Sequence, residues 1–166
     1  MEPQTILLII IIIATISYVF DQLLDYVNLK SMRSDIPDDV ALFYDRSRYL
    51  RSLDYHRELT QFSFITAAFS FMLSIGMLLS GGFGWLDDTL RQFVQNPIPH
   101  ALLFFALLVL ASDILTTPFQ LYSTFIIEEK FGFNKTTVKT FFADKLKGYL
   151  LAALIGAPLL ALLIYL

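Results

Sequence analysis

The sequence contains no cysteine and has little charge. Without cysteine, a disulfide framework, thiol catalysis and cysteine-ligated zinc are all excluded. Charged residues make up 16% of the 166 residues, whereas a soluble domain carries about 25%. The net charge of −3 offers no basic surface, so nucleic acid is not expected as a partner. What is present is apolar: 56% of the residues are hydrophobic and the mean hydropathy is +0.63. This composition favours a protein of the lipid bilayer.

Four apolar stretches have the length of a membrane-spanning helix, which takes about 20 residues. We expect these spans near residues 5–28, 60–82, 98–127 and 147–166. No Lys or Arg precedes the first stretch and no small-x-small cleavage site follows it, so we expect a retained anchor rather than a signal peptide. In the third span, Pro118 is expected to produce a kink. The expected fold class is all-α: a multi-pass transmembrane helical protein with about four spans plus amphipathic cytoplasmic helices, in a single membrane domain.

Basic residues are distributed unevenly among the connecting segments. Eleven of the twelve Lys and Arg residues lie in segments 21–58 and 128–147, and only Arg91 lies in the middle connection. The positive-inside rule therefore predicts cytoplasmic segments near 29–59 and 128–146, with the N-terminus and the Gly81–His100 loop outside or in a lumen. The compact loops favour a bacterial inner membrane, with the endoplasmic reticulum as the alternative. Membrane lipid is the first expected partner.

The first cytoplasmic segment has a pattern of its own. SDIPDDV, at residues 34–40, is typical of a turn that could cap a helix. The following ALFYDRSRYLRSLDYHRELTQ, at residues 41–61, repeats apolar positions at helical intervals against arginines and acids. It predicts an amphipathic helix, either lying on the membrane surface or leading directly into the second span.

The sequence offers little for metal chemistry. A catalytic zinc takes three protein ligands, most often histidines. The chain has two, His56 and His100, which the expected topology places on opposite sides of the membrane. His56 lies in HRE rather than in HExxH, where two histidines are one helical turn apart. We therefore expect no metal ligand in this chain and interpret both histidines as polar side chains at the interface.

Asp113 is an ionisable residue inside the third span, and such residues are costly in the bilayer and are candidates for function. Thr116, Thr117 and Gln120 follow it within two turns. Together they form a candidate intramembrane polar site. One interpretation is a polar face that lines a water-filled space; the other is a buried, protonated or hydrogen-bonded helix contact. Neither supplies a reaction.

The stretch FIIEEKFGFNKTT, at residues 125–137, joins the third span to the fourth. Glu128 and Glu129 end the third span at the cytoplasmic surface. Gly132 can adopt the left-handed conformation that terminates a helix, and Asn134 can cap the next helix. These residues predict a well-capped helical corner, which by itself requires no active site.

The longer stretch TPFQLYSTFIIEEKFGFNKTT resembles the signature of the N-terminal region of the type I CAAX prenyl proteases, which are integral-membrane zinc metalloendopeptidases. A second stretch, YDRSRYLRSLDYHRELTQFSF, is similar to that family's approach to its second span. The positions that match the corner signature are Pro118, Tyr122, Ile127, Glu128, Glu129, Lys130, Gly132, Phe133 and Asn134.

The resemblance implies a seven-span helical fold that encloses a large chamber, with zinc held by an HExxH helix and a later glutamate downstream of this region. It implies cleavage of prenylated CAAX proteins or other membrane proteins. This chain contains no HExxH, so we expect chamber wall without the catalytic domain, inactive alone. The corner residues would be structural and close to the active site. The implied partners are the catalytic half and, in the full enzyme, prenylated or membrane protein substrates.

The last apolar run stops at Leu166 without a charged flank, and we expect a longer protein. The alternative is a complete four-span membrane scaffold or small transporter component. In that case Asp113 and the threonines after it would form the polar pathway or the helix-contact surface.

Overall fold

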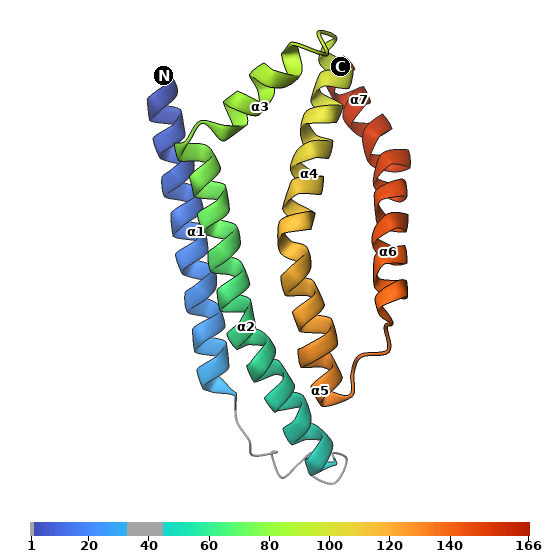
Figure 1. Ribbon diagram of the computed structural model, residues 1–166. Coiled ribbons are helices and arrows are strands. Elements are labelled where there is room, and N and C mark those ends of the chain that lie inside the picture. Colours follow the sequence, from blue (N-terminus) through green and yellow to red (C-terminus); the bar gives the residue numbers. More distant parts are fainter. Residues whose placement is uncertain (1, 33–44) are drawn as a thin grey trace. The chain divides into compact units, whose positions relative to one another are not determined.

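The regular elements are all helical in the computed structural model, which describes residues 2–32 and 45–166 (Figure 1). The expectation of an all-α fold is confirmed. The elements are α1 (Pro3–Ser31), α2 (Arg46–Leu79), α3 (Gly82–Arg91), α4 (Pro97–Tyr122), the π-helix η1 (Ser123–Glu128), α5 (Glu129–Phe131), α6 (Val138–Leu151), the π-helix η2 (Ala152–Gly156) and α7 (Ala157–Tyr165).

Four helical stretches are long and apolar enough to cross a membrane: Pro3–Ser31, Arg46–Leu79, Pro97–Phe131 and Val138–Tyr165. Their mean hydropathy lies between 2.0 and 2.3 over the most apolar windows. Among the described residues, only Ile127 and His100 are buried. Large apolar side chains left exposed along whole helices are unfavourable in water but suit a lipid environment.

The chain divides into two compact units, and the first contains α1, α2 and the residues from Phe119 to Asn134. In it α1 and α2 run antiparallel, side by side (Figure 1). The ring of Tyr18 in α1 stacks on Phe71 in α2, with the centroids 4.2 Å apart. Phe119 packs against Phe69 of α2 at a centroid distance of 4.9 Å. Aromatic contacts of this kind contribute beyond the area they bury, and they join the end of the third span to α2.

The second unit comprises Gly81–Pro118 and Lys135–Leu166. It begins with α3, a helix that the sequence analysis did not predict. Of the glycines in SGGFGW, Gly81 alone adopts a left-handed conformation, with φ of 71°, and the helix starts at the next residue. Glycine takes this conformation without steric cost. An ion pair between Asp87 and Arg91, which lie one helical turn apart, supports α3.

The amphipathic segment leads directly into the second span, since α2 runs without a break from Arg46 to Leu79. Its first turn is capped by Asp45, whose Oδ1 accepts the backbone N–H of Ser47 at 2.9 Å. A carboxylate at this position satisfies free N–H groups and complements the helix dipole. The turn expected at residues 34–40 and the helix start expected at residues 41–44 lie outside the described residues.

The third span does not end at its internal proline. Pro118 lies within α4, and the helix continues into η1, where the hydrogen-bonding pattern widens to that of a π-helix. Such widened turns are rare and occur mostly as single turns within α-helices. The fourth span contains a second one, η2, directly before α7, which has Pro158 in its first turn.

Candidate functional site

The helical corner after α5 is closed by backbone hydrogen bonds around Gly132. This residue has φ of 75°, as the sequence predicted for a helix terminator. Its N–H donates to the Glu129 carbonyl at 3.0 Å, and the Phe133 N–H donates to the Glu128 carbonyl at 2.9 Å. A left-handed residue at this point lets the last carbonyls of the helix find donors. The helix can therefore end here with the carbonyls of Glu128 and Glu129 hydrogen-bonded.

Asn134 does not cap the next helix, and that prediction was wrong. Its side-chain Nδ2 donates to Glu129 Oε2 at 3.0 Å and so ties the corner to the end of α5. The cap of α6 is Thr137, whose hydroxyl oxygen accepts the Thr140 N–H at 3.2 Å. Thr137 has extended backbone angles, φ −90° and ψ 157°, which suit an N-cap. The helix α6 starts four residues after Asn134, beyond a stretch without regular secondary structure.

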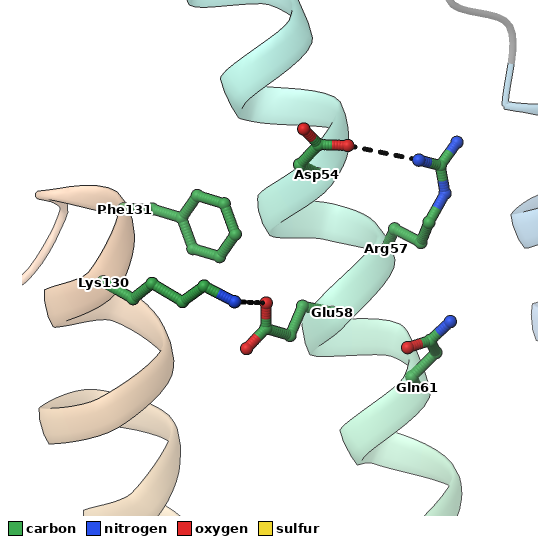
Figure 2. A pocket seen from close by; sticks show the side chains of 6 residues that line it. All are labelled: Asp54, Arg57, Glu58, Gln61, Lys130 and Phe131. Carbon is green, nitrogen blue, oxygen red and sulfur yellow. Dashed lines mark hydrogen bonds and ion pairs between the residues drawn. The ribbon is translucent and has the colours of Figure 1, made fainter.

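Lys130 links the corner to α2. Its Nζ lies 2.5 Å from Oε2 of Glu58, across a sequence separation of 72 residues. Figure 2 shows the lysine side chain extending from its own helix to the glutamate on α2. The lysine side chain is 59% exposed and that of Glu58 33% exposed. Glu58 was not among the predicted site residues, and no local pattern could have revealed a partner so distant in sequence.

Aromatic contacts join the same two segments. The ring of Tyr55 on α2 lies 4.8 Å from that of Phe133 and 5.7 Å from that of Phe131. Farther along α2, Phe62 lies 4.8 Å from Tyr122. Tyr55 and Phe62 have Glu58 between them at spacings of three and four residues, so the three share one face of α2. The signature residues Tyr122, Lys130 and Phe133 therefore all contact a single helical face, which we call the α2 docking face (Tyr55, Glu58 and Phe62).

A shallow cavity of about 530 Å³ opens beside the Lys130–Glu58 pair. Arg57 and Asp54 form a second ion pair there, 3.1 Å apart, within one turn of α2 (Figure 2). The lining thus carries two charges of each sign and an aromatic ring. The lining residues are Asp54, Arg57, Glu58, Gln61, Lys130 and Phe131.

The second unit contains a polar cluster around Asp113. Lys145 on α6 places its Nζ 2.6 Å from Oδ1 and 2.7 Å from Oδ2 of this carboxylate. The same ammonium donates to the Thr117 hydroxyl at 2.9 Å, and the Tyr149 hydroxyl donates to Asp113 as well. The side chains of Lys145 and Asp113 are 15% and 23% exposed. This geometry is that of a hydrogen-bonded contact between helices, the second of the two interpretations considered for Asp113, and its functional role stays a prediction.

Of the residues in the predicted polar site, Thr116 and Thr117 lie with Asp113 in the second unit. Thr117 joins Asp113, and its own hydroxyl also donates to the Asp113 carbonyl at 2.6 Å. The Thr116 hydroxyl donates to the Ser112 carbonyl of its own helix at 2.9 Å. Gln120 belongs to the other compact unit. The partners that the sequence analysis missed, Lys145 and Tyr149, lie about one helical turn apart on α6, where the lysine had been counted only as a cytoplasmic charge.

Comparison with known proteins identifies the family. A family model described as "CAAX prenyl protease N-terminal, five membrane helices" matches residues 25–166. The chain belongs to this CAAX prenyl protease N-terminal family. It is therefore a multi-pass integral membrane protein, and the resemblance found in the corner signature is confirmed.

Relatives within the CAAX prenyl protease family are longer than this chain. It is 31% identical over 155 residues to "CAAX prenyl protease 1 homolog" of Oryza sativa, covering 89% of this chain and 36% of the rice protein. It is 33% identical over 143 residues to "Probable CAAX prenyl protease 1" of Schizosaccharomyces pombe, covering 75% of this chain and 30% of that protein. The crystal structure of S. mikatae Ste24p superposes with a TM-score of 0.80 at 28% identity, covering 98% of this chain and 39% of that one. The chain thus spans about a third of the length of these relatives.

Residues 2–32 and 45–166 contain no group of three or more His, Asp or Glu side chains placed to share an ion. His56 and His100 fall in different compact units. A catalytic zinc needs at least three protein ligands, so this donor set does not fit one.

Proposed function

We propose that this chain is the N-terminal membrane region of a zinc metalloendopeptidase that cleaves prenylated or membrane-associated proteins. In this role it builds part of the chamber wall and supports the catalytic half. The observation that carries the proposal is the family match across residues 25–166, together with contacts of its signature residues Tyr122, Lys130 and Phe133 to one face of α2. Residues that form such contacts act by holding the chain in place.

The contacts that hold the corner in place indicate its role. Lys130 and Phe133 anchor it to the α2 docking face, and Asn134 with Gly132 sets its turn. A catalytic constellation has to be held within a fraction of an ångström by supporting residues. We assign this positioning task to the corner, on the cytoplasmic side, for a catalytic half that carries the metal ligands. No bond-breaking step is assigned to the residues of this chain.

The test compares membranes from cells in which the encoding gene is intact with membranes from cells in which the codons for residues 1–166 are deleted. A farnesylated C-terminal CAAX peptide is the substrate, and a metal chelator defines the specific signal. Cleavage that the chelator inhibits should disappear on deletion and return when the undeleted gene is supplied on a plasmid. The purified 166-residue chain should not cleave the peptide. Unchanged cleavage after the deletion would contradict the proposal.

A further inference from the structure

His100 connects three parts of the second unit through its ring. It lies in the first turn of α4 and is 6% exposed, one of two buried residues in the described part of the chain. Its Nε2 lies 2.7 Å from Oδ1 of Asp87 on α3, and its Nδ1 lies 3.3 Å from the carbonyl oxygen of Val94. The ring of His100 thus contacts both α3 and the connection between the two helices, an arrangement we call the His100 clamp (His100, Asp87 and the Val94 carbonyl).

Both partners of the ring accept hydrogen bonds and neither can donate one. A backbone carbonyl has no proton, and Asp87 is held as a carboxylate by Arg91, whose Nε lies 2.7 Å from Oδ2. These hydrogen bonds, first from Arg91 and then from His100, keep the pKa of Asp87 below its usual value. A neutral imidazole donates from only one nitrogen, whereas an imidazolium donates from both. Both contacts of the His100 clamp can therefore form together only when the ring is doubly protonated.

The surroundings of the ring contain few other charges. A cavity of about 310 Å³ adjoins it, lined from α3 by Asp87 and Arg91, from α7 by Ile164, and otherwise by apolar residues of α4. Asp88, the next carboxylate on α3, is exposed. The ring therefore faces one carboxylate, that of Asp87, which also bonds to the guanidinium of Arg91. The number of hydrogen bonds that the ring can donate depends on its own protonation state.

We infer that the His100 clamp is a pH-operated catch on the connection between α3 and α4. With the ring doubly protonated, both contacts form and residues 92–96 are held against the helices. Loss of one proton removes either the carbonyl contact or the carboxylate contact, and the connection loosens. Histidine side chains typically change charge between about pH 5 and about pH 8. The clamp is complete at the acidic end of this range and released at the alkaline end.

The absence of cysteine makes a direct test practical. A spin label on a single introduced cysteine, Gln95→Cys, reports the mobility of the connection in the full chain reconstituted in lipid nanodiscs. Gln95 is exposed and follows Val94. Mobility should rise as the pH is raised from about 5 to about 8. His100→Gln should abolish this dependence, because its amide does not titrate. His56→Gln, in the other compact unit, is the matched control and should leave the response intact.

A pH-independent mobility in the otherwise unchanged chain would overturn the inference, as would a normal response in His100→Gln. If His100→Gln does not fold, Asp87→Asn gives an independent answer. The asparagine oxygen can still accept from the ring but no longer favours its positive charge, so the transition should move to lower pH. A transition at the same pH in Asp87→Asn would mean that the carboxylate is not part of the catch.

Discussion

At the level of single residues, two lysine–carboxylate pairs differ in their surroundings. Lys130 and Glu58 are 59% and 33% exposed, whereas Lys145 and Asp113 are 15% and 23% exposed. An exposed pair contributes at most about 1 kcal/mol. Breaking a buried pair costs more, because the remaining charge stays desolvated without its partner. The Lys130–Glu58 pair therefore mainly sets the orientation of the corner, and the Lys145–Asp113 pair is important for the stability of the second unit.

We predict that Asp113→Asn lowers the free energy of unfolding by roughly 2–3 kcal/mol, somewhat less than for a fully buried pair. The double variant Asp113→Asn/Lys145→Met should recover most of this loss, because no unpaired ammonium remains. Unfolding in mixed detergent micelles measures both. The control is Asp144→Asn, which breaks the pair with Lys147, whose two side chains are 71% and 59% exposed. Equal losses for Asp113→Asn and Asp144→Asn would contradict the prediction.

Asp45 makes the start of α2 sensitive to acid. The hydroxyl and backbone N–H of Ser47 donate to its carboxylate at 2.7 and 2.9 Å and hold the pKa of Asp45 below its usual value. A pKa lowered by folding contributes stability that is complete above the unfolded-state value and is lost as the pH falls through the folded-state value. The melting temperature of the chain should therefore exceed that of Asp45→Asn at about pH 6, and the gap should narrow towards about pH 3. A gap that stays constant over this range would show that the charge of Asp45 has no role in the cap.

At the level of elements, the corner depends on one backbone conformation. Gly132 has φ of 75° and open space where a Cβ would lie. Gly132→Ala should therefore be destabilising by about 1–2 kcal/mol through backbone strain alone. Gly148 in α6 also has open space but an ordinary helical conformation, so Gly148→Ala should stabilise by roughly 0.5–1 kcal/mol. Chemical unfolding of the two variants should give opposite signs, and a stabilising Gly132→Ala would exclude the strain argument.

The helices themselves could be predicted because their signals are local. Long apolar runs predicted the spans, and a glycine after a charged turn predicted the left-handed residue at position 132. The short helix α3 was missed because its sequence is rich in glycine, and only Gly81 uses glycine's conformational freedom. Asparagine and threonine are both good N-caps, so residue type alone did not show that Thr137 rather than Asn134 caps α6. The choice depended on Glu129, which bonds to the asparagine side chain.

The partners within the sites could not be predicted in the same way. Asp113 could be identified because an ionisable residue is energetically costly in an apolar span. Its partner Lys145 lies 32 residues farther along the chain. Glu58 lies 72 residues from Lys130. Pairings at such distances depend on how helices pack, and helical periodicity shows only which residues share a face. The corner signature in the sequence indicated the family. Only the packing of the helices in the structure shows which face of α2 the corner contacts.

At the level of the whole molecule, the uneven distribution of basic residues predicts how the chain crosses the membrane. The connection after α3 should lie outside and the one before α6 inside. Single cysteines at Gln95 and Lys135, one in each connection, test this in intact cells with a membrane-impermeant maleimide. Gln95→Cys should react before lysis and Lys135→Cys only after it, while the unsubstituted chain, which has no cysteine, gives the background. Labelling of both from outside would contradict this topology.

The π-helix η1 sets the direction in which the side chain of Lys130 points. Each α-helical residue turns the side-chain direction by about 100°, and a π turn accommodates one residue more than an α turn. If residues 123–128 were wound as an ordinary α-helix with no residue removed, Lys130 would be rotated by roughly 100°, off the α2 docking face. The direction of the Lys130 side chain thus depends on the wide winding of η1 as much as on the identity of its residues. In this segment a one-residue deletion that restored α-helical winding would keep Lys130 directed at α2, whereas a substitution that tightened η1 to an α-helix would turn it away.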